Sequence, residues 1–176
     1  MLPLLLAFAF IALIFIVVIA GQPDEFVVSR SATISAPSEK IFPYVNDLHR
    51  WEAWSPWAKL DPNVKNSFSG PDSGAGAAMA WDGNKKIGAG KMTITESRPG
   101  ESISFRLEFI RPFQATNTAE FHFQSEAGRS VVAWTMTGRS NLFFKVFGLF
   151  KNCDGLVGKD FEKGLASLKM VAEAGR

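Results

Sequence analysis

The chain has 176 residues, the size of a single domain. Its 19 basic and 17 acidic side chains are interspersed and give a formal charge of +2, so a nucleic-acid-binding surface is not expected. Cys153 is the single cysteine of the sequence, which excludes an intramolecular disulfide and a zinc site built from cysteines. We predict neither a metal nor a cofactor.

The first 20 residues contain no charged or polar side chain. As a helix they would span about 30 Å, enough to cross a bilayer. We therefore expect a single-pass anchor over residues 1–20, a membrane location and a short linker over residues 21–25. A cleaved signal peptide is the alternative, because Val18 and Ala20 fit a cleavage site, although no basic residue precedes the apolar run. The charges do not specify which side of the membrane the domain occupies.

A strand is predicted over residues 26–35, which are rich in Val, Ser, Thr and Ile. Ser38 is a plausible N-cap for a helix, and Asp47 is a plausible cap for a second short helix. Residues 54–62 contain two prolines and indicate an irregular but ordered segment.

Short strands separated by turn residues follow from residue 64 onward. Alternation is clearest in residues 102–110, where Ile103, Phe105, Leu107 and Phe109 share one face. The connections are too short for crossovers, so the sheet is expected to be antiparallel. The predicted strands are residues 65–69, 77–81, 90–97, 102–110, 116–124 and 130–138.

A long helix closes the chain from residue 154, and its apolar residues lie on one stripe. Gly158 and Gly164 lie on the edges of that stripe. Glycines there remove volume that a core helix normally supplies, which suggests a helix held over a hollow sheet. An antiparallel sheet with helices on one face is an α+β domain. The stripe consists of Val157, Phe161, Leu165, Leu168 and Ala172.

Three stretches of the sequence resemble the SRPBCC superfamily of helix-grip proteins (Bet v 1- and START-like), and specifically its polyketide cyclase/dehydrase-like branch. They are residues 34–37 with 41–45, residues 51–57 with 61–62, and residues 160–165 with 168–169. The resemblance implies a domain over residues 26–173 in which a curved sheet of about seven strands wraps around the C-terminal helix. It also implies an apolar cavity between them, since members of the superfamily bind lipids, sterols and polyketides. Some members are aromatase/cyclases.

We expect a hydrophobic ligand to be held by inward-facing side chains of the sheet and the last helix. Each of these residues could instead simply pack in a core. The predicted lining is Trp81, Phe105, Phe109, Phe121, Trp134, Met136, Phe161, Gly164, Leu165 and Leu168. The predicted cavity mouth is Trp54, Trp57 and Phe147.

Three functions remain open from the sequence. The first is a membrane-anchored domain that binds a hydrophobic small molecule or lipid. The second is a cyclase or dehydratase acting on an apolar carbonyl compound, which needs a titratable group facing the ligand. His49 and His122 are expected on the surface, and we assign no catalytic residue. The third is a protein-interaction module with a filled core.

Overall fold

The computed structural model describes residue 10, residues 13–139 and residues 153–174. Seven strands form one antiparallel sheet in the order β1-β7-β6-β5-β4-β3-β2. The strands are β1 (Glu25–Ile34), β2 (Lys65–Ser69), β3 (Ala78–Asp82), β4 (Ala89–Arg98), β5 (Ser102–Arg111), β6 (Ala115–Glu126) and β7 (Arg129–Arg139). Beside a helical segment over residues 13–20, the helices of the domain are α2 (Ser38–Asn46), the 3-10 helix η1 (Leu48–Ala53) and α4 (Cys153–Ala174).

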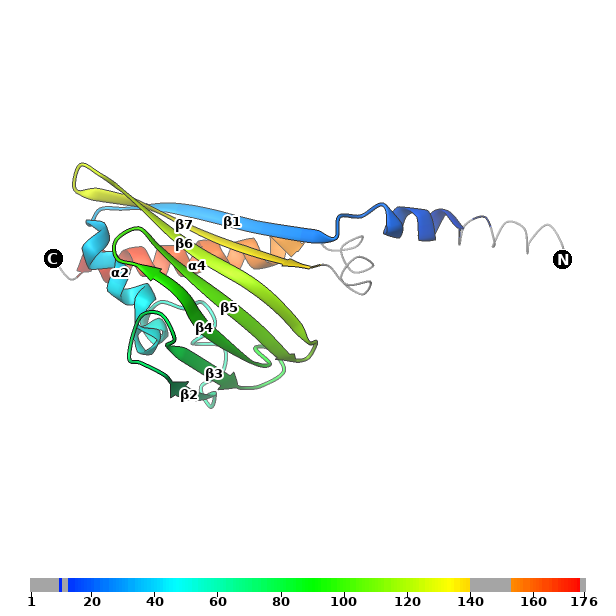
Figure 1. Cartoon of the computed structure of the whole chain (residues 1–176), viewed down its shortest axis with the longest axis horizontal. Coiled ribbons are helices and arrows are strands. Elements are labelled where there is room, and N and C mark those ends of the chain that lie inside the picture. The colour runs from blue at the N-terminus through cyan, green and yellow to red at the C-terminus, as the bar shows by residue number, and fades with distance from the viewer. Residues whose placement is uncertain (1–9, 11–12, 140–152, 175–176) are drawn as a thin grey trace.

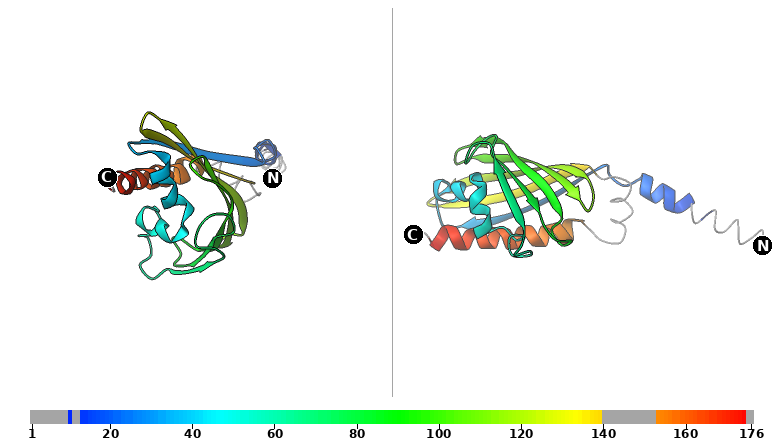
Figure 2. Two further views of the ribbon diagram at one scale, coloured as in Figure 1. Left: turned by 60° about the vertical axis from the view of Figure 1, so that its left-hand side comes forward. Right: turned by 90° about the horizontal axis from the view of Figure 1, so that it is seen from below.

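The sheet is curved, and its concave face holds the helices (Figures 1 and 2). α4 lies against β1, α2 and η1, whereas β3, β4 and β5 curve away from it. This is the α+β helix-grip arrangement that the sequence predicts, with two short helices after the first strand and a long helix at the end.

Alternation along the strands places the expected face in the core. Phe121 and Phe105 are completely buried, while Arg106 is exposed and pairs with Glu108 on the outer face. The apolar stripe of α4 is also confirmed, because Phe161, Leu165 and Leu168 are each at most 1% exposed.

The cap of α2 differs from the prediction. Pro37 occupies the N-cap position, and Ser38 is already the first helical residue. The Ser38 hydroxyl is buried and lies 3.0 Å from the hydroxyl of Ser125, so it joins α2 to the end of β6. Asp47 does cap η1 as expected, because its carboxylate accepts a hydrogen bond from the backbone of His49.

The expected single-pass membrane segment over residues 1–20 is contradicted. Across the residues that the structure describes, no helix is both long and apolar enough to cross a bilayer. Residues 1–9 and 11–12 lie outside the described part. The assignment of a membrane location is withdrawn.

Candidate functional site

Inward-facing residues of neighbouring strands form two rows across the end of the sheet at which β1 begins and β7 ends. We call this surface the distal end. In its first row each residue pairs with the next one on the neighbouring strand, and the row consists of Trp81, Gly90, Phe109 and Ala115. The second row is paired in the same way and consists of Met79, Met92, Leu107, Asn117, Gly138 and Phe26.

Burial increases with distance from the distal end. Trp81, Phe109 and Leu107 are only half-buried, as are Phe26 and Met79. The next row along the sheet is fully buried and consists of Val28, Met136, Ala119, Phe105 and Ile94, each at most 7% exposed. A side chain with almost no accessible surface faces neither solvent nor a water-sized space. Among the described residues, the concave face is therefore filled in its middle and incompletely covered at the distal end.

The filled middle is an aromatic cluster. The indole of Trp134 lies between two rings, with Phe161 of α4 stacked at 3.9 Å and Phe121 at 4.8 Å between centroids. Trp54 and Trp57 meet the same indole edge-on at 5.7 Å. Edge-on and stacked contacts of this kind add to the burial of apolar area.

The indole N–H of Trp134 is buried and has no hydrogen-bond acceptor among the described residues. An unmade hydrogen bond of a buried donor costs about 1–3 kcal/mol, which aromatic faces recover only in small part. Among the described residues, this nitrogen is the single buried side-chain nitrogen or oxygen atom that has no hydrogen-bond partner.

The predicted hollow beside the helical glycines is not what the structure shows. A Cβ on Gly164 would lie 2.8 Å from Cζ3 of Trp134 and 3.1 Å from Cδ of Pro56. The guanidinium of Arg30 lies across Gly158. Both glycines make room for side chains of other elements, so the prediction that they mark a cavity is wrong.

The two predicted mouth tryptophans that the structure describes have different surroundings. Trp54 is 1% exposed and donates its indole N–H to the carbonyl of Tyr44 at 2.8 Å, which makes it a core residue. Trp57 is half-buried and contacts Phe161 and Trp134. Phe147 lies outside the described residues.

Trp81 and Phe109 meet edge-on at the distal end, with 5.9 Å between ring centroids. Gly90 allows this arrangement, because a Cβ there would lie 2.5 Å from the indole of Trp81. The Trp81 N–H donates to the carbonyl of Ile87 at 3.3 Å, which fixes the ring. Beside Phe109 and Ala115, at the β5–β6 hairpin, there is a depression of about 380 Å³.

Sequence reasoning missed the polar member of these rows. Asn117 of β6 is 8% exposed and faces inward beside apolar side chains. The alternation of residues 116–124 put it on the same face as Ala119 and Phe121, which was the available signal. A single Asn in an apolar strand face does not by itself indicate a site.

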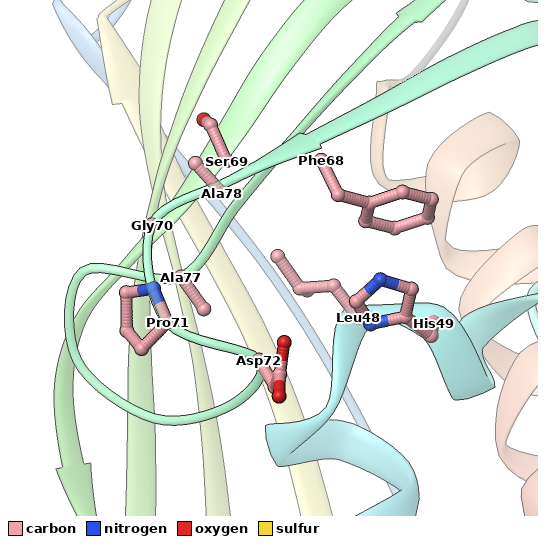
Figure 3. Close-up of a pocket in the computed structure, with 9 residues that line it drawn as sticks. All are labelled: Leu48, His49, Phe68, Ser69, Gly70, Pro71, Asp72, Ala77 and Ala78. Atoms are coloured by element: carbon pink, nitrogen blue, oxygen red, sulfur yellow. The ribbon is translucent and has the colours of Figure 1, made fainter.

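A second hollow, of about 130 Å³, lies outside the grip between η1 and the β2–β3 connection (Figure 3). The imidazole of His49 stacks on the ring of Phe68 at 4.0 Å there, and its Nδ1 lies 3.0 Å from the carboxylate of Asp47. His49 and His122 have side chains 50% and 61% exposed, as expected for surface residues.

The fold agrees with what comparison with known proteins shows. Residues 25–173 match the model of a family described as polyketide cyclase / dehydrase and lipid transport. No match among curated proteins was found.

Solved structures of low sequence identity share the fold. Protein CV1439 from Chromobacterium violaceum has a TM-score of 0.60 at 14% identity, with 86% of this chain and 99% of that chain covered. The di-domain ARO/CYC BexL from the BE-7585A biosynthetic pathway has a TM-score of 0.60 at 14% identity, with 90% of this chain and 53% of that chain covered. Ara h 8.0201 has a TM-score of 0.59 at 11% identity, with 85% of this chain and 99% of that chain covered.

At these identities the structural likeness shows the fold alone, while the family model covers most of the sequence. The chain belongs to the polyketide cyclase/dehydrase and lipid transport family and has the helix-grip fold of Bet v 1-like proteins.

Proposed function

We propose that this protein binds a hydrophobic small molecule at the distal end of its sheet. The observation that carries the proposal is the contrast in burial along one concave face. Five of the six large apolar side chains of the first two rows are half-buried, with Met92 the buried exception at 5% exposure, whereas the next row is completely packed. Ligand sites are typically concave, mostly apolar and supplied with few polar groups.

Trp81 and Phe109 are the residues that we expect to contact the ligand directly, with Trp57 at the side nearest α4. The remaining predicted lining residues form the packed floor beneath it, and they position the site without touching the ligand. This floor consists of Phe105, Phe121, Trp134, Met136, Phe161, Gly164, Leu165 and Leu168, all buried. The family description, which includes lipid transport, supports a ligand of this class.

A cyclase or dehydratase would need a titratable side chain facing the ligand. The inward residues of the two distal rows are apolar apart from one neutral amide. No observation on the described residues therefore favours the enzymatic alternative, and we do not propose it.

Two neighbouring residues of β5 provide a matched test. Phe109 faces inward at the distal end, and Ile110 is 56% exposed on the other face of the same strand. We expect Phe109→Gln to weaken binding of naphthalene to the full chain about tenfold or more, since it removes an aromatic contact and leaves a polar group there. Ile110→Gln should leave binding unchanged.

Affinity is measured by titration calorimetry or by quenching of tryptophan fluorescence, with both variants checked for wild-type circular dichroism. Equal weakening in the two variants, or binding unaffected by Phe109→Gln, would place the ligand elsewhere.

A further inference from the structure

Asn117 is the one polar side chain that faces inward in the two rows of the distal end. It pairs across the sheet with Leu107 on β5 and with Gly138 on β7. Asn is unfavourable in strands, and a buried amide without a good partner is costly. Its presence in an apolar surface therefore calls for an explanation.

Apart from the indole N–H of Trp134, the other buried polar side-chain groups of the described residues have strong partners. Ser130 donates to the carbonyl of Ala36 at 2.9 Å, and Ser38 lies 3.0 Å from the hydroxyl of Ser125. Asp61 accepts from the backbone N–H groups of Asn63 and Asn84 at 3.0 and 2.7 Å. Each of these bonds ties two segments of the backbone together, so each has a structural role.

The Asn117 amide has no comparable partner. Its recorded hydrogen bond runs from Nδ2 to the thioether sulfur of Met136 at 3.8 Å. A thioether is a weak acceptor, so this contact leaves most of the hydrogen-bonding capacity of the amide unused. The amide joins no two backbone segments.

Gly138 makes room for this amide, because Oδ1 of Asn117 and the ring of Phe26 occupy the space above it. A Cβ at Gly138 would lie 2.2 Å from Oδ1 of Asn117 and 2.7 Å from the ring of Phe26. Any side chain at this position would therefore displace the amide or the ring. Oδ1 of Asn117 therefore lies over Gly138 beside the ring of Phe26, while Nδ2 of the same amide lies 3.8 Å from the sulfur of Met136.

No cation accompanies the amide among the described inward residues of the distal end. Arg30 lies deeper in the grip, and its guanidinium is already bound to the carboxylates of Asp154 and Glu162 at 2.8 Å each. A ligand carboxylate would therefore enter an apolar surface without a counterion, which is strongly unfavourable.

We propose that Asn117 binds the single hydroxyl or carbonyl group of a neutral apolar ligand and so selects neutral, mono-polar compounds over hydrocarbons and carboxylates. This inference rests on the proposed function, because it assigns the polar contact of the same site. An amide offers both a donor and an acceptor, so a hydroxyl and a carbonyl are both accommodated.

The test compares three probes with one ring system: naphthalene, 2-naphthol and 2-naphthoate, each titrated into the full chain at pH 7.5. We expect 2-naphthol to bind about five- to tenfold more tightly than naphthalene, as one added hydrogen bond predicts. In Asn117→Leu the two affinities should become equal. Thr118→Val, an exposed change on the other face of β6, should preserve the preference.

Gly138→Ala gives a second test should Asn117→Leu fail to fold, because the added methyl displaces the amide and should reduce the same preference. Equal wild-type affinities for naphthalene and 2-naphthol would overturn the role of Asn117 and leave the proposed function standing. A preference retained in Asn117→Leu, or 2-naphthoate bound as tightly as 2-naphthol, would also overturn it. Binding of none of the three probes would overturn both proposals.

Discussion

The three glycines of α4 have different surroundings, although a sequence shows them as equivalent. Nothing lies within 4 Å of a Cβ built on Gly155, which is exposed. A Cβ on Gly164 would meet Trp134 and Pro56, and one on Gly158 would meet the guanidinium of Arg30. Gly158 and Gly164 therefore permit close packing of other elements against α4, whereas Gly155 has no packing neighbour.

Alanine substitution should separate these roles within one helix. Gly164→Ala is expected to lower the free energy of unfolding by about 1–3 kcal/mol, because it overpacks the contact between α4 and the Trp134 stack. Gly155→Ala should raise it by roughly 0.5–1 kcal/mol, since alanine favours the helix and meets no neighbour. Urea unfolding of the full chain measures both. Stabilisation by Gly164→Ala would show that space exists beside this glycine after all.

At the scale of elements, Arg30 joins β1 to the first half of α4. Its guanidinium donates to both carboxylate oxygens of Asp154, at 2.8 and 3.0 Å, and to Glu162 at 2.8 Å. Gly158 lies between these two acids along the helix and leaves the space that the guanidinium occupies. The hydrogen bond from Arg30 lowers the pKa of Asp154 below the ordinary value of 3.8, against a smaller opposing effect of desolvation.

This pairing predicts how stability depends on pH. Because the folded-state pKa of Asp154 is lowered, its contribution is complete above about pH 4 and is lost as the pH falls through the lower folded value. The melting temperature should therefore fall more steeply between pH 4 and 2.5 for the wild type than for Asp154→Asn. Asp160→Asn is the control in the same helix, because Asp160 pairs only with the exposed Lys163 among the described residues.

The control should keep the wild-type slope in thermal melts followed by circular dichroism. A slope that is identical in all three proteins would show that the ion pair with Arg30 does not couple α4 to β1.

At the scale of the whole molecule, the strands and their facing were predictable, because an amphipathic strand shows its period directly in the sequence. The seven strands and α4 were found close to their expected bounds. The alternation also gave the inward face of β5, including Phe105 and Phe109.

The packing across the grip was not predictable, because it depends on which side chains meet. The sequence shows that Gly164 lacks a side chain, but only the fold shows that Trp134 occupies the space. For the same reason Phe105 and Phe109, which look equivalent in the strand pattern, lie in the packed floor and at the half-buried distal end respectively. Asn117 could be identified as a candidate ligand contact only from the fold, because the fold shows that its amide has a weak hydrogen-bond partner.

The central claim is that ligand binds at the distal end and not in the middle of the grip. The most direct measurement is a methyl NMR titration of the full chain with 2-naphthol. We expect resonances of Met79, Met92 and Leu107 to shift with one saturable affinity, while those of the deeply buried Val132 and Leu168 stay in place. Shifts confined to Val132 and Leu168, shifts at Leu48 and Ala77 beside the outer hollow, or no shifts at saturating probe would contradict the account.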